Sequence, residues 1–250
     1  MTTTDSPLLD NPIWNALSTD HAPLALGDGR ARRYPPEIGP LSGISDQSEA
    51  SYAALAKLAV EYPVVLFSLD PIRPPHGWTE LRTGPLVQMI RDESSRAPSF
   101  AIASPSPRVG NHEPSRTPVP AGETLRQLTP ADSPAMVALA ELTEPGPFRL
   151  RTIELGNFYG IFHDGRLVSM AGKRMRLPGF VEVSGVCTHP DARGRGYARR
   201  LMHIVMDEIE GGGKTPFLHA WADNPAIRLY EQLGFTLSRT FHLAVLKHIA

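Results

Sequence analysis

A glycine- and arginine-rich segment in the C-terminal half has the residue types and spacing best suited to chemistry. An apolar run ends at Thr188, Pro190 follows, and the sequence Arg-Gly-Arg-Gly at 193–196 leads into an amphipathic stretch. Glycines let a loop backbone approach a ligand without interference from a Cβ atom. The free amides and the dipole of a helix N-terminus attract anions, and Arg193 and Arg195 add positive charge. The segment predicts a phosphate site; the alternative is an ordinary strand-to-helix loop with solvated arginines.

Two familiar phosphate motifs do not match this segment. No Lys-Ser or Lys-Thr pair follows the second glycine, which excludes a P-loop. Arg199 stands where a dinucleotide fingerprint needs its third glycine. The elements expected before the loop are a hairpin and a strand, not a βαβ unit. The loop therefore predicts a phosphate ligand without either of these nucleotide-binding folds.

This loop and a second motif resemble the GNAT family of acetyltransferases. The family signature is a strand, a proline and then Arg/Gln-x-x-Gly-x-Gly/Ala at the start of a helix, and residues 193–198 match every position. Residues 226–235, Ala-Ile-Arg-Leu-Tyr-Glu-Gln-Leu-Gly-Phe, are similar to the family's Ala-Ile-x-Leu-Tyr-x-x-x-Gly-Phe helix and turn. The resemblance covers residues 123–247. One position departs from it: Asp223 takes the place of the usual asparagine, and Asn224 follows one residue later.

The resemblance implies that acetyl-CoA is the cosubstrate. Its pyrophosphate is expected on the loop amides, and its pantetheine arm along the strand that ends at Thr188, like an added strand. An amine then attacks the thioester carbonyl directly. The implied cofactor-binding residues are Val186, Cys187, Thr188, Arg193, Gly194, Arg195, Gly196, Tyr197, Ala198 and Asn224.

Two residues are candidates for proton transfer. Glu182 lies four residues before Val186, so strand alternation places both on one face, and a glutamate there resembles the base of the histone-modifying branch. Tyr230 is the candidate acid for the leaving thiolate. The alternatives are a salt-bridge or exposed role for Glu182 and a core role for Tyr230. Lys173 and Arg174 indicate a solvated strand end, with contact to an anionic acceptor as the alternative.

The order of expected elements predicts a mixed α/β fold, with a GNAT acyltransferase domain at residues 123–250. The strands are expected at 124–128, 157–163, 167–175, 180–188, 217–222 and 235–247, and the helices at 129–142, 196–210 and 225–233.

The first 150 residues hold most of the 25 prolines, which indicates that the two halves are built differently. Residues 1–103 predict an N-terminal α/β domain, either a degenerate copy of the same fold, as in some two-domain relatives of glycine N-acyltransferase, or a substrate-shaping lid. A helix is expected at 48–60 and strands at 64–67 and 100–102. Residues 104–122 are proline-rich and predict a linker, or else a long surface loop within one domain.

Composition narrows the function classes. The balance of 25 basic and 26 acidic residues is not that of a strongly basic nucleic-acid binder. With one cysteine and no metal-type histidine spacing, we expect no disulfide and no metal site. No apolar run reaches the length of a membrane span and no signal peptide pattern opens the chain, so we expect a cytoplasmic protein without membrane contact.

The predicted function is N-acetyl transfer to a primary amine of a small molecule, amino acid or peptide, and a homodimer is compatible with the sequence. The alternatives are a non-catalytic acyl-CoA-binding regulator, transfer of a longer acyl chain and transfer to oxygen.

Overall fold

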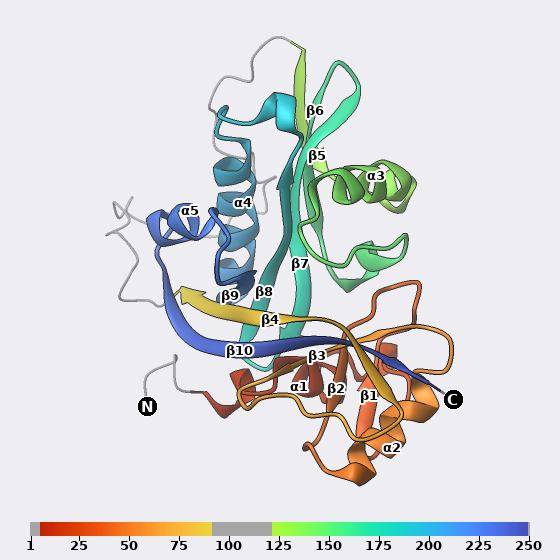
Figure 1. Cartoon of the computed structure of the whole chain (residues 1–250). Helices are drawn as coiled ribbons and strands as arrows, with labels where there is room; N and C mark the ends of the chain where they lie inside the picture. Colours follow the sequence, from red (N-terminus) through yellow and green to blue (C-terminus); the bar gives the residue numbers. More distant parts are fainter. Residues whose placement is uncertain (1–5, 92–121, 250) are drawn as a thin grey trace.

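A single large sheet organises the part of the chain that the computed structural model describes, residues 6–91 and 122–249 (Figure 1). Its eight strands are all antiparallel to their neighbours except for one parallel pair, β8 and β9. In spatial order they are β3 (Val64–Ser68), β10 (Phe235–His248), β4 (Trp78–Arg91), β9 (Thr215–Trp221), β8 (Phe180–Thr188), β7 (Arg166–Leu177), β6 (Phe158–His163) and β5 (Glu123–Gln127). Strands β1 (Ala31–Arg33) and β2 (Ser42–Ile44) form a separate small sheet.

Helices cover both faces of the large sheet. The helices are α1 (Pro12–Ser18), α2 (Glu49–Leu58), α3 (Ser133–Thr143), α4 (Tyr197–Gly211) and α5 (Ile227–Gln232). Short 3₁₀ turns lie at Pro7–Leu9, Ala22–Leu24, Pro130–Asp132, Thr152–Leu155 and Pro190–Ala192. In Figure 1, α4 and α5 lie on one side of β7 and β8, and α3 lies on the other. The predicted mixed α/β fold is confirmed, and the expected C-terminal elements all form.

Helix α4 is the longest helix in the described chain, and its sequence explains its position. Tyr197, Leu201, Val205 and Ile209 recur every four residues, and all four are buried against the sheet. Each fully buried side chain of this kind stabilises the fold by about 1.5–3 kcal/mol. This burial fixes the helix axis and therefore fixes where its N-terminal amides lie.

The N-terminal residues contribute directly to the large sheet. Strand β4 lies between β10 and β9, and β3 pairs with the outer edge of β10. Residues 86–90, a short apolar run whose periodicity does not distinguish a helix from a strand, belong to β4. The strand expected at 100–102 and nearly all of the proline-rich 104–122 segment lie outside the described residues, so the division into domains stays a prediction. The described strands from both sides of that segment share one sheet.

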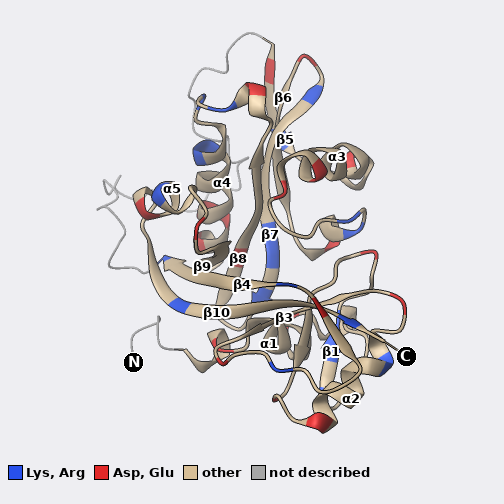
Figure 2. Cartoon of the chain, in the orientation of Figure 1, with Lys and Arg blue, Asp and Glu red and all other residues tan. Residues whose placement is uncertain are grey.

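Charged residues of both signs are interspersed over the described ribbon (Figure 2), in line with the near-zero net charge. None of the helices within 6–91 and 122–249 combines the length and the apolarity that crossing a bilayer requires.

A buried polar contact ties the N-terminal residues to β7. His21 is fully buried; its Nε2 accepts a hydrogen bond from Arg176 Nε at 3.0 Å, and its Nδ1 lies 2.7 Å from the Tyr34 hydroxyl. Burial first, and then the Arg176 charge, lower the pKa of His21 to about 4. The ring is therefore neutral at pH 7 and serves as a fixed acceptor.

We expect this histidine to make the fold acid-sensitive. Between the ordinary pKa of 6.5 and the folded value of about 4, the unfolded chain binds a proton that the folded chain does not. Stability should therefore fall by roughly 3 kcal/mol as the pH drops from 7 to 4. Melting temperatures across this range should fall less steeply for His21→Gln than for the wild type. The exposed control His76→Gln should follow the wild type. Equal slopes for His21→Gln and the wild type would contradict this role.

Candidate active site

The parallel strands β8 and β9 separate to form a wedge. They pair only from Phe180 opposite Thr215 to Glu182 opposite Phe217. Beyond that point β8 pairs with β7 on its other side, and β9 pairs with β4 on its other side. The facing edges therefore hold backbone N–H and C=O groups without a partner strand, and such groups favour an extended ligand.

A β-bulge in β8 lies inside this wedge. Ser184 and Cys187 are opposite Gly172 and Met170, so three steps along β8 match two along β7. Gly185 has a φ of +64°, and a Cβ there would lie 2.9 Å from the Phe158 ring, so the bulge requires glycine.

The bulge changes which residues share a face. The alternation that placed Glu182 and Val186 together is wrong for this strand, because the extra residue shifts the count by one. Val186 lines the wedge cavity, whereas Glu182 is fully buried.

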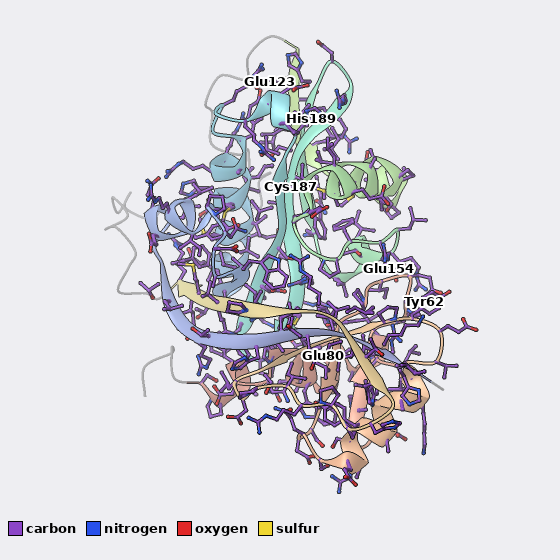
Figure 3. All side chains as sticks on the ribbon, in the orientation of Figure 1. Tyr62, Glu80, Glu123, Glu154, Cys187 and His189 are labelled. Atoms are coloured by element: carbon purple, nitrogen blue, oxygen red, sulfur yellow. The ribbon has the colours of Figure 1, made fainter. Side chains whose placement is uncertain are left out.

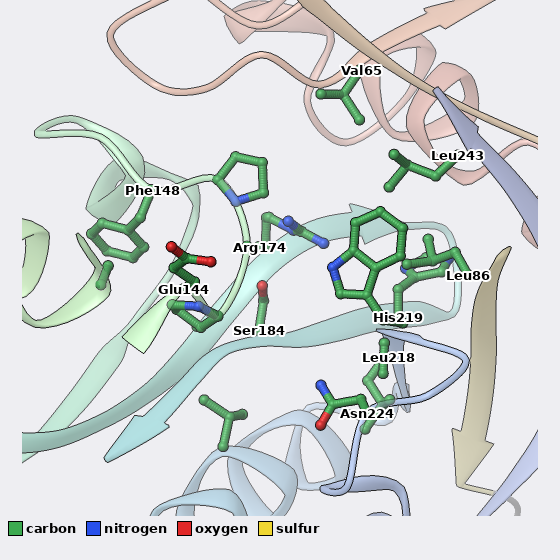
Figure 4. Close-up of a pocket in the computed structure, with 18 of the residues that line it drawn as sticks. Val65, Leu86, Glu144, Phe148, Arg174, Ser184, Leu218, His219, Asn224 and Leu243 are labelled. Atoms are coloured by element: carbon green, nitrogen blue, oxygen red, sulfur yellow. The ribbon is translucent and has the colours of Figure 1, made fainter. Parts of the chain in front are cut away.

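A cavity of about 540 Å³ occupies the wedge (Figure 4). One wall is β8 and β9, a second is the loop after α3, and a third comes from the N-terminal strands and β10. Its lining includes Val186, Tyr230, Asn224, Arg174, Glu144 and Val65. The N-terminal residues therefore help to form the cavity as well as the sheet.

The predicted phosphate loop has the geometry of an anion cradle. Gly194 and Gly196 have φ values of +78° and +77°, and an added Cβ at either would meet no atom within 4 Å. The backbone amides of residues 194–199 have no partner among the described residues, because the first bond into α4 is from Arg200 to the Gly196 carbonyl. These open amides at a helix N-terminus fit a pyrophosphate.

The remaining loop residues support the cradle in different ways. Arg193 Nε donates to the Thr188 carbonyl at 3.3 Å, which joins the loop to the end of β8. The Tyr197 side chain is buried and its hydroxyl donates to Glu123, so only its backbone is open to a ligand. Arg195, the second arginine of the loop, is exposed. Thus the cradle begins where the free edge of β8 ends.

Glu182 lies in a dense set of polar contacts. Its two oxygens accept hydrogen bonds from Arg174 Nε and Nη2, both at 2.7 Å, and Oε1 also lies 2.8 Å from His219 Nδ1. Burial alone would raise the pKa of Glu182, but the Arg174 charge and these hydrogen bonds lower it to about 2. A fully ionised, fully bonded carboxylate is a weak proton acceptor. The base role predicted for Glu182 stays a prediction, and these contacts favour the salt-bridge alternative.

His219, which also lines the cavity, extends this network to Gln88 on β4. Gln88 Nε2 lies 3.1 Å from His219 Nε2 and 3.2 Å from the Leu9 carbonyl, so the amide donates to both. Burial lowers the pKa of His219. A neutral ring then donates through Nδ1 to Glu182, and the chain of contacts orients the carboxylate toward Arg174.

Tyr230 lies where a proton donor is needed. Its ring lines the cavity together with Val186, and its hydroxyl has no hydrogen-bond partner among the described residues. Burial raises the pKa of Tyr230 to about 12, so the phenol keeps its proton at neutral pH. Its acid role, predicted from the sequence, stays a prediction that this geometry supports.

The structure also places the other predicted cofactor-binding residues, Asn224, Cys187 and Thr188. Asn224 lines the cavity while its Oδ1 accepts from the Ala226 amide at 2.9 Å, and the preceding Asp223 is exposed. Cys187 packs with the side chains of α3 (Figure 3), and burial raises the pKa of its thiol to about 11, which disfavours a nucleophilic role. Thr188 is held by a 2.8 Å hydrogen bond to Ser169. Within the described residues no group of three or more His, Cys, Asp or Glu side chains could hold a metal ion.

Arg174 is not the solvated strand end that the sequence indicated, because the residue is 8% exposed and its side chain is ion-paired with Glu182. The signal was present in the hairpin that turns at Pro178 and Gly179. Pairing of Leu177 with Phe180 carries Arg174 close to Glu182. No sequence pattern predicted that residues of the N-terminal strands β3 and β4 would line the cavity.

The protein has a mixed α/β fold. An anion cradle at the N-terminus of α4 lies beside the parallel strands β8 and β9, which separate from each other. The family model of FR47-like protein matches residues 158–243. The structure of a protein from Novosphingobium aromaticivorans, assigned as an acetyltransferase of the GNAT family, is 37% identical, covers 98% of this chain and 100% of its own, and has a TM-score of 0.80. The chain therefore belongs to the GNAT family of acetyltransferases.

A more distant solved structure is similar in fold alone, and a curated relative matches only part of the chain. A GCN5-related N-acetyltransferase from Kribbella flavida is 18% identical over 93% of this chain and 95% of its own, with a TM-score of 0.55. A curated relative, UPF0157 protein YqkA of Bacillus subtilis, is 28% identical over 87 residues, and the match spans 35% of this chain and about a quarter (25%) of that protein. Family membership supports acyl transfer from an acyl-CoA in general, as the sequence resemblance implied.

Proposed function

We propose that this protein transfers the acetyl group of acetyl-CoA to a primary amine. The observation that carries the proposal is the set of open amides at 194–199, next to the end of β8, whose unpaired edge borders the cavity that Val186 and Tyr230 line. A pyrophosphate on the cradle and an extended arm on that edge would bring a thioester to Val186.

The chain's residues supply binding, orientation and one proton. The cradle amides hold the phosphates, and the unpaired backbone of β8 holds the arm. A neutral amine attacks the thioester carbonyl, and the carbon–sulfur bond then breaks. The Tyr230 phenol gives its proton to the departing thiolate, and the proton lost by the amine leaves through the mouth of the cavity. Placement of the phenol, rather than acidity, makes this transfer effective, because its pKa is raised.

Acetyl-CoA should stabilise the protein and be consumed by it. At a concentration one hundred times the dissociation constant, the gain in unfolding free energy should be about 2.7 kcal/mol. Thermal unfolding with and without acetyl-CoA measures this gain, and thiol release in the presence of a panel of primary amines measures transfer. No melting shift at millimolar acetyl-CoA would overturn the proposed cosubstrate, and a shift without thiol release from any amine would favour the regulator alternative.

Tyr230→Phe should slow transfer without weakening acetyl-CoA binding. The ring is kept but the proton is lost, so kcat should fall about 10²-fold, with solvent replacing the phenol in part. Steady-state thiol release together with the acetyl-CoA dissociation constant checks this split. Tyr159→Phe is the matched control, because the Tyr159 hydroxyl contacts Glu208 outside the cavity. An unchanged kcat in Tyr230→Phe would remove Tyr230 from the mechanism.

A further inference from the structure

Arg174 presents unused hydrogen-bond donors to the cavity. Its Nε and Nη2 atoms each donate to Glu182, which uses two of the five guanidinium N–H groups. Nη1 has no partner among the described residues, and Arg174 lines the cavity although it is only 8% exposed. Figure 4 shows the guanidinium within the cavity. The end of the guanidinium that remains free carries two N–H groups side by side, the arrangement that a carboxylate accepts.

Glu182 fixes the orientation of the Arg174 guanidinium. The carboxylate is itself held by His219 Nδ1 at 2.8 Å and by the Met175 amide at 3.4 Å. An arginine whose orientation is set by such contacts loses little conformational entropy when it binds a second anion. Glu182 is thus a positioning residue for Arg174.

The end of α3 and the following loop bring charged side chains to the cavity. Glu141 and Glu144 line it together with Arg149. Glu144 has a φ of +48°, uncommon outside glycine, and its carboxylate points into the cavity in Figure 4. A cavity that holds both the Glu144 carboxylate and the free donors of Arg174 can receive the ammonium and the carboxylate of one small molecule.

The third wall is apolar. Val65 and Phe67 of β3, Leu86 of β4, and Leu243 and Val245 of β10 line it. At its edge the Arg82 guanidinium stacks 4.3 Å from the centre of the Trp221 ring. An apolar wall of this kind favours an aliphatic or aromatic group by about 25 cal/mol for each Å² removed from water.

We infer that the acceptor is an amine that also carries a carboxylate and an apolar side chain, an α-amino acid in the simplest case, with Arg174 as the residue that selects the carboxylate. The inference rests on the proposed function and specifies its acceptor. The carboxylate contacts the free end of Arg174, the side chain lies against β3 and β10, and the amine lies between Glu144 and the thioester.

Matched pairs of acceptors test the inference in the wild-type enzyme. We expect L-leucine and L-phenylalanine to be acetylated with kcat/KM at least about 10²-fold above 3-methylbutylamine and 2-phenylethylamine, which lack only the carboxylate. Arg174→Lys keeps a charge beside Glu182 but loses the planar fork, so the acid-to-amine ratio should fall about 10-fold or more. A purely structural role would lower both rates together and leave that ratio unchanged.

A binding measurement separates this inference from the proposed function. With the enzyme saturated by CoA, calorimetry should show L-leucine binding more tightly than 3-methylbutylamine. Preferential binding without transfer would retain the inference and overturn the proposed function. Transfer to both members of each pair at equal rates, or transfer only to amines without a carboxylate, would overturn the inference and retain the function.

Discussion

Gly196→Val is expected to abolish acetyl-CoA binding in a protein that still folds. Gly196 has a φ of +77° and caps α4, and the space beside it is open for a ligand. Valine disfavours this backbone angle, and its side chain would enter the space where the pyrophosphate meets the amides. The change should remove the melting shift caused by acetyl-CoA. The strain alone costs about 1–3 kcal/mol, which a domain of ordinary stability can absorb.

Gly213→Val is the matched control. Gly213 lies just beyond the other end of α4, has a φ of +70° and also faces open space. It should show a similar loss of stability but a full acetyl-CoA shift. Wild-type affinity in folded Gly196→Val would mean that the cradle is misplaced.

Glu182→Gln is expected to destabilise the fold rather than only slow the reaction. The amide has nearly the same shape but no charge, so Arg174 is left as a buried cation without its counter-ion. Breaking a buried pair by neutralising one partner costs about 3–5 kcal/mol. Chemical denaturation of the two proteins at pH 7 measures the difference. Glu154→Gln, which disrupts the exposed pair with Arg151, should change the stability far less, because solvent screens that pair.

The stability difference between the wild type and Glu182→Gln should depend on pH. The folded pKa of Glu182 is lowered to about 2 from an ordinary value of 4.5, so the charge stabilises the fold fully above about pH 4.5. That stabilisation is lost as the pH falls toward 2, and the gap between wild type and Glu182→Gln should close over the same range. A variant as stable as the wild type that loses about 10²–10⁴-fold in rate would instead establish the base role.

The sequence predicts the C-terminal elements and the cradle well because both depend on local patterns. Apolar residues every four positions define α4, and the glycines of 193–198 allow the positive φ angles that its N-terminus needs. The helix at 48–60 and the strand at 64–67 follow from the same kind of pattern.

The rest depends on contacts between residues far apart in the chain. Strand β4 is placed between β10 and β9 by pairings that span more than a hundred residues, and no local pattern specifies that choice. The bulge at Gly185 adds one residue to β8, so a two-residue alternation cannot place Glu182. His219 and Gln88, which orient Glu182, lie on two different strands. A count along one strand therefore places Glu182 near the cavity but cannot specify the contacts that surround its carboxylate.

Direct detection of the product is the measurement closest to the central claim. The enzyme is incubated with isotopically labelled acetyl-CoA and a primary amine, L-leucine included, and both products are quantified by mass spectrometry. We expect N-acetylated amine and free CoA to appear in equal amounts with the wild type, and neither to appear above background with Gly196→Val. CoA release without an N-acetylated product from any amine, or equal product from the Gly196→Val protein, would contradict the account.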